Sequence, residues 1–401
     1  MPPTTDHQSF LGRSILSIRR NQVSAMETSS TSQDQELQDL DIFQKRISDS
    51  FINLTSSTSP PDLLSIEWLR KLLDVYLCCE AEFKAAILLR RDPSHITKPP
   101  MDRQIPDLVD RAVKSLDICN AVTNGVESVQ HWKKLADIAV GAMEQKPVGE
   151  GQVRRARKAL SNLVAAMSNE EVMSSVNNGK STERAWSFGR KGSSSGGGGG
   201  GMKEGNVGSF RSLSMTVSRS WSAAKQIQAM AANLAMPRGG EATGMGMIVY
   251  IMSTVMVFVM WVLVMAIPCQ DKSGVASHIP IPRQLACAAP MIGLQDRISE
   301  ELKKREKNKG NAGLLEELQK LEKCSHGCIE LMDSLVFPVE EEKAEEMRAK
   351  LGELGETCQK MEEGLDPLRR QVREVFHRMV RSRAEILLIF DNTGKSPSPI
   401  L

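Results

Sequence analysis

Apolar residues recur every three or four positions along much of this chain, which is the period of a helix with one buried face. The clearest stripe includes Phe43, Ile47 and Phe51, with polar residues between them. Four or five such stripes fall before residue 168, and their short connections predict an antiparallel bundle. Asn124-Gly125 is expected to break or kink the third stripe. The predicted helices cover residues 34–54, 61–89, 101–119, a fourth through 129–140 that stops at Pro147, and 153–167.

The same period returns in the last third of the chain. Leu314, Leu318 and Leu321 begin a stripe close to a heptad repeat, which fits a second bundle or a coiled-coil-like element. The stripe is compatible with pairing inside the chain or with a second copy, so it does not fix the oligomeric state. The expected helices cover residues 290–309, 311–335, 338–365 and 367–390.

Composition narrows the fold class to all-α. Aromatic residues are only 4% of the chain, whereas it contains 21 methionines. Such a composition disfavours a sandwich or barrel and favours helices with a flexible aliphatic core. The formal net charge of +2 gives no reason to expect nucleic-acid binding.

Changes in composition divide the chain into predicted segments. Residues 168–242 are rich in Ser, Gly and Arg and poor in large aliphatic side chains, which is typical of a flexible, disordered linker. A short helix is predicted inside it from Ser222 to Leu234. The full plan is a disordered basic tail (1–33), an N-terminal bundle (34–167), this linker (168–242), an apolar helix (243–269), a Pro-rich loop (270–289), a C-terminal helical region (290–391) and a tail (392–401).

The apolar helix has two interpretations. Its central run of about 23 residues is long enough to span a bilayer, and basic residues before it favour a cytosolic N-terminal half. We therefore predict a single-pass, membrane-associated protein in contact with lipid. The alternative is a cytosolic protein in which this helix, apolar all round, is a buried core element. The predicted membrane segment includes Met245, Ile248, Val249, Tyr250, Val255, Phe258, Trp261, Leu263 and Ile267.

Four serines in or next to the linker lie three residues after an arginine: Ser187, Ser193, Ser214 and Ser222. Basophilic kinases read such a spacing, and each phosphate would add nearly two negative charges to a basic segment. Phosphorylation would then release the segment from anionic lipid. The alternative is a linker in which the pattern arises from Ser-rich composition alone.

Nothing in the sequence predicts catalysis. The run Gly196–Gly201 lacks the preceding strand and the GK[ST] ending of a phosphate-binding loop. Cys324 and Cys328 are four residues apart, but no second pair completes a zinc site, so buried thiols are expected there. We predict no enzyme activity, no catalytic residue, no metal, no cofactor and no small-molecule substrate.

Several long strings resemble one plant family. They are SFLGRSILSIRR at Ser9–Arg20, SRSWSAAKQIQAMAANLAMPRG at Ser218–Gly239, FVMWVLVMAIPCQD at the end of the apolar run, and the later PRQLACAAP. These strings are similar to those of the plant BYPASS-related proteins, also called Roh-like. The resemblance covers nearly the whole chain and is strongest from Ser218 to Arg297.

The resemblance implies a plant-specific protein without catalytic activity that acts in growth and developmental control or in exocyst-linked secretion. Exocyst subunits are therefore the expected protein partners. Together with the apolar helix, this predicts a non-enzymatic, membrane-associated adaptor. The alternative is a soluble cytosolic scaffold of the same helical class.

Overall fold

The computed structural model describes residues 34–56, 63–89, 98–144, 148–168, 221–239, 244–269, 275–307 and 313–393. These residues form helices and connections without any strand, which confirms the all-α class. The elements are a helix over residues 34–56, α2 (Ile66–Lys84) with its π-helical extension η2 (Ala85–Leu89), α3 (Met101–Ala142), α4 (Glu150–Ser168), α6 (Ala223–Ala232), α7 (Gly244–Ala266), α8 (Ala288–Lys307), α9 (Glu316–Asp333) and α10 (Glu341–Thr393).

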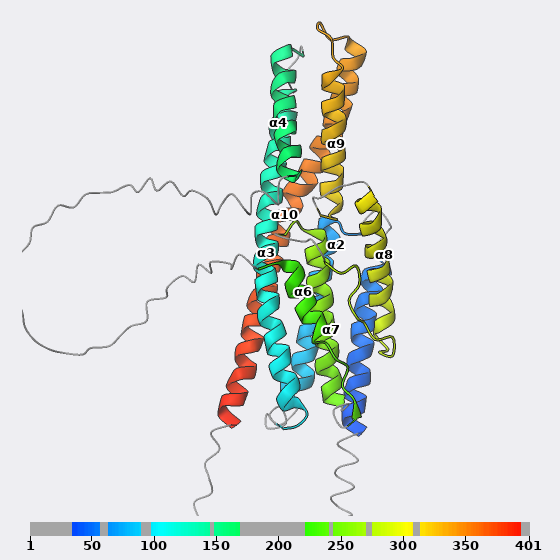
Figure 1. Ribbon diagram of the computed structural model, residues 1–401, viewed down its shortest axis with the longest axis vertical. Coiled ribbons are helices and arrows are strands. Elements are labelled where there is room, and N and C mark those ends of the chain that lie inside the picture. The colour runs from blue at the N-terminus through cyan, green and yellow to red at the C-terminus, as the bar shows by residue number, and fades with distance from the viewer. Residues whose placement is uncertain are drawn as a thin grey trace, which may run out of the picture.

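Two long helices, α3 and α10, run through the elongated body (Figure 1). They are antiparallel, because Gln130 bonds to Asp366 at 2.9 Å while Lys133, further along α3, pairs with the earlier residue Glu362. In the upper half of the view, α4 and α9 complete a bundle with them. The lower half adds the helix over residues 34–56, α2, α6, α7 and α8.

The predicted break at Asn124-Gly125 is wrong, because α3 continues through it. A Cβ atom at position 125 would lie 2.2 Å from the backbone oxygen of Pro268. Glycine is therefore retained inside this helix because the chain that leaves α7 passes directly against it. The earlier part of the stripe and the part after Gly125 belong to one helix.

The two helices predicted at either side of Pro367 are also one helix, α10. Proline cannot donate the helical hydrogen bond and its ring crowds the preceding turn. Leu365, two residues before the proline, and Leu368, directly after it, are both buried. Their burial offsets that loss by holding α10 against its neighbours.

The apolar helix α7 lies inside the body, where α2, α3 and α6 pack against it (Figure 1). Every residue from Gly244 to Ala266 is buried. Phe258 and Trp261 are fully buried, and the indole N–H of Trp261 donates to the backbone oxygen of Ala276 at 2.9 Å. Residues from before and after the linker thus share one hydrophobic core around α7.

Candidate functional site

The start of α9 is tied to the end of α7 by backbone hydrogen bonds. The Leu314 N–H donates to the oxygen of Met265 at 3.0 Å, and the Leu315 N–H donates to that of Ala266 at 3.1 Å. The last carbonyl groups of a helix have no partner inside it. The chain before α9 supplies partners for two of them, which fixes where α9 begins relative to the core.

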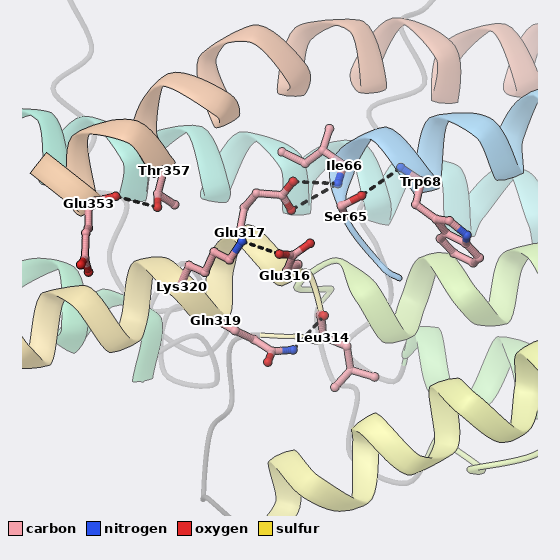
Figure 2. A network of polar contacts seen from close by, with 10 residues as sticks. All are labelled: Ser65, Ile66, Trp68, Leu314, Glu316, Glu317, Gln319, Lys320, Glu353 and Thr357. Atoms are coloured by element: carbon pink, nitrogen blue, oxygen red, sulfur yellow. Dashed lines mark hydrogen bonds and ion pairs between the residues drawn. The ribbon is translucent and has the colours of Figure 1, made fainter. Parts of the chain in front are cut away.

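Glu317, in the first turn of α9, joins this junction to α2 (Figure 2). Its two carboxylate oxygens accept the backbone N–H of Ile66 at 3.0 and 3.2 Å, across 251 positions of sequence. Ser65 is the N-cap of α2 and accepts the N–H of Trp68 at 3.2 Å. Two side chains from distant segments therefore satisfy the donors at the N-terminus of α2.

The environment of Glu317 shifts the pKa of its carboxyl upward. Burial raises the pKa of its carboxyl to about 7, while the N–H of Ile66 and the charge of Lys320 act in the opposite direction. A carboxylate at a helix N-terminus is stabilised by the partial positive charge there. Because the oxygens face backbone donors, this group acts as a cap between α2 and α9 and has no arrangement that suggests acid–base catalysis.

An open groove of about 1080 Å³ lies between α8, α9 and the first half of α10. Its walls carry lysine and arginine side chains interspersed with glutamates, and pairs such as Arg305 with Glu322, at 2.7 Å, cross between helices. Cys324, His326 and Thr357 also line it. Such a mixed, solvent-open surface is suited to binding a charged helix or peptide.

The residues predicted to face lipid all lie in α7 or, for Ile267, directly after it, and all are buried inside the protein. In the part of the chain that the structure describes, α7 is the one helix long and apolar enough to cross a membrane, and 94% of its most apolar window is buried.

Of the predicted phosphorylation sites, Ser187, Ser193 and Ser214 lie outside the described residues. Ser222 is 1% exposed and caps α6, where its hydroxyl accepts the N–H of Lys225 at 3.3 Å. In this conformation its hydroxyl is covered. A kinase could reach it only after the start of α6 opens.

Sequence reasoning gave no role to Glu317 or to Arg111, two buried charged residues with partners far along the chain. Glu316 and Glu317 are acids in a first helical turn, and this is the one sequence signal that could have identified a cap. Cys324 and Cys328 are free thiols, and no group of metal-ligating side chains occurs among the described residues.

The family model described as Protein ROH1-like matches residues 2–390. Protein ROH1A of Arabidopsis thaliana is 49% identical over 425 residues, covering 100% of both chains. Protein ROH1D of the same plant is 44% identical over 407 residues, covering 98% of each. No solved structure matches the chain. The resemblance seen in the sequence is thus confirmed, and the chain belongs to the ROH1-like family.

Proposed function

We propose that this chain is a non-enzymatic adaptor that binds other proteins through the end of its body formed by α9 and α10. The observation that carries the proposal is the groove of about 1080 Å³ between α8, α9 and α10. Charges of both signs on its walls would select a partner by charge pattern as well as by shape.

An apolar tip lies at the turn between α9 and α10. Val336 and Phe337 expose 74% and 38% of their surface there. Exposed aromatic and aliphatic side chains beside polar surface are typical of protein contacts. A partner that laid a charged face in the groove and an apolar one on this tip would use both surfaces.

We propose further that the protein is a cytosolic scaffold and that α7 is its core helix. Burial of α7 on every side supports this, because a bilayer-spanning helix of one chain would present much of its surface to lipid. Removing α7 from this body would also expose the partners it covers, including Phe51, which is 0% exposed.

Exocyst subunits are the partners to test first, because the family resemblance suggests them. Binding to purified subunits is compared for the wild-type chain and the double variant Lys323→Glu with Lys360→Glu. Both lysines are exposed and line the groove, one on α9 and one on α10. We expect the double variant to bind at least about ten-fold more weakly, because the two new glutamates would repel the partner carboxylates that the lysines attract.

The matched control reverses two exposed charges outside the groove, Arg155→Glu with Lys158→Glu on α4. The control is expected to bind as the wild type does. Equal loss in both double variants, or no binding of any subunit by the wild type, would reject the proposed use of the groove.

The location of α7 is tested separately by fractionation. Cells that express a C-terminally tagged chain are lysed without detergent, and membranes are washed with alkaline carbonate. We expect the protein in the soluble fraction or released by the wash. Retention in the washed membranes, with the tag protected from protease, would support the membrane-spanning alternative instead.

A further inference from the structure

A smaller cavity of about 240 Å³ lies between the first turns of α3, the middle of α7 and the chain after α6. Arg103, Asp107 and Arg111 line it from α3, and Tyr250 and Ser253 line it from α7. The cavity is named the Arg111 pocket after its most buried charged residue. It is separate from the groove at α9 and α10, which shares none of these residues.

Arg111 is only 6% exposed, although its side chain carries a positive charge. Its Nη2 donates to the backbone oxygen of Asn233 at 2.5 Å and its Nη1 to the Ser253 hydroxyl at 3.4 Å. Its Nε–H has no acceptor, and no carboxylate of the described residues forms an ion pair with it. Asp107 and Asp110 act on Arg111 only through space. A buried guanidinium without a contacting counter-charge is costly, so an anion in the cavity would offset part of that cost.

The other groups in the cavity are suited to the same ligand. Burial raises the pKa of the Tyr250 phenol, against a side-chain hydrogen bond with Thr254 and the charge of Arg111, which lower it. The phenol therefore stays protonated and can donate a hydrogen bond. Burial lowers the pKa of Arg111, whereas the nearby charges of Asp107 and Asp110 raise it. Two arginines against one aspartate leave the lining net positive, and arginine forks match the geometry of oxyanions.

We propose that the Arg111 pocket binds an oxyanion, a carboxylate or a phosphate group, between Arg111 and the Tyr250 hydroxyl, with Arg103 at its entrance. A cavity of about 240 Å³ holds such a group together with a few further atoms of the molecule that carries it. Arg111 and Tyr250 come from α3 and α7, so the bound anion links the core helix to the longest helix of the N-terminal half.

Isothermal titration calorimetry of the full chain tests the proposal. Inorganic phosphate and acetate are titrated separately at constant ionic strength, so that the two sources of an oxyanion are distinguished. We expect saturable binding at one site for at least one of them. The variants Arg103→Gln and Tyr250→Phe are each expected to weaken it at least about five-fold, because each removes a donor to the anion.

Two further variants separate a binding site from a general charge effect. Lys134→Gln removes an exposed positive charge from the same helix outside the cavity and is expected to leave affinity unchanged. Asp107→Asn removes the opposing negative charge from the lining and is expected to tighten binding about three-fold. If Arg111 served only to stabilise the fold, the chain would bind no anion at this cavity, and Asp107→Asn would not tighten anion binding.

The outcomes that overturn the proposal are distinct. They are no saturable binding of either anion to the wild-type chain, wild-type affinity in both Arg103→Gln and Tyr250→Phe, or a loss in Lys134→Gln as large as in those two variants. Arg111→Gln is measured by thermal denaturation with and without phosphate. If it folds, it is expected to lose the wild-type rise in melting temperature with phosphate. If it does not fold, the affinities of Arg103→Gln and Tyr250→Phe test whether the pocket binds an anion.

Discussion

The ring of Phe51 meets the ring of Phe258 edge to face, with centroids 5.6 Å apart and planes at 81°. Phe51 comes from the first described helix and Phe258 from the middle of α7, and both are 0% exposed. Residues from two segments separated by the linker thus form one close aromatic pair. This contact makes α7 part of the folding core and allows its contribution to be measured.

Phe258→Ala is expected to lower the free energy of unfolding by about 3–5 kcal/mol, because it removes a fully buried ring and leaves a cavity. Urea denaturation of the purified chain in detergent-free buffer measures the change. Val380→Ala on α10, where the side chain is 41% exposed, is the control and should cost less than about 1 kcal/mol. Equal stability of Phe258→Ala and the wild type would mean that α7 is not packed in this core.

Two glycines of α3 provide a matched pair for the approach between α3 and the chain after α7. Gly125→Ala places a methyl group 2.2 Å from the Pro268 oxygen, whereas a Cβ at Gly141 meets nothing within 4 Å. Gly141→Ala should therefore stabilise the protein by about 0.5–1 kcal/mol through helix propensity. Gly125→Ala should destabilise it by about 1–3 kcal/mol or more through overpacking. Thermal and urea denaturation of both variants check the opposite signs, and stabilisation by both would contradict this close approach.

Sequence periodicity was sufficient to predict the helical segments, because each amphipathic helix repeats a buried stripe every three or four residues. It misread Gly125 and Pro367 as helix ends. The local preference of each residue disfavours a helix, but tertiary neighbours that the sequence does not show keep α3 and α10 continuous there. An all-apolar helix such as α7 has no polar face to show whether lipid or protein surrounds it.

The buried charged residues could not be predicted for a different reason. Glu317 meets Ile66 across 251 positions, and Arg111 meets Asn233 and Ser253 through the fold rather than through any local motif. Both roles depend on tertiary neighbours. No spacing within one helix indicates them.

Glu317 makes stability depend on pH near neutrality. Its folded-state pKa of about 7 lies above the ordinary value of 4.5, so the folded protein holds this proton more tightly than the unfolded one. This tighter proton binding stabilises the folded state. The stabilisation is fully present below the ordinary pKa and is lost as the pH rises through about 7. When the pH is lowered from about 8 to about 5.5, the free energy of unfolding of the wild type should rise by about 2 kcal/mol relative to that of Glu317→Gln, which cannot ionise.

Urea denaturation of both proteins over this range measures the difference. The glutamine keeps an oxygen that accepts the Ile66 N–H, so the variant isolates ionisation from loss of the cap. Glu316→Gln removes an acid from the same turn and should keep the pH dependence of the wild type. Parallel pH curves for wild type and Glu317→Gln would show that the buried carboxyl does not titrate in this range.

The eight cysteines report directly on the closure of the core. All are free thiols: Cys78 is exposed, six are buried, and Cys324 in the groove is half-buried, with a pKa raised by burial that slows its reaction. Burial raises the pKa of Cys119 to about 12 and that of Cys328 to about 11, and the thiolate is the reactive form. A disulfide reagent at neutral pH should therefore label one thiol quickly in the native chain, and Cys78→Ser should abolish this fast phase.

In denaturant the wild type should show eight reactive thiols and the variant seven. Fast labelling of Cys79, Cys119 or Cys287 without denaturant would mean that the helices around α7 open readily, and the closed core proposed for the cytosolic scaffold would then be untenable.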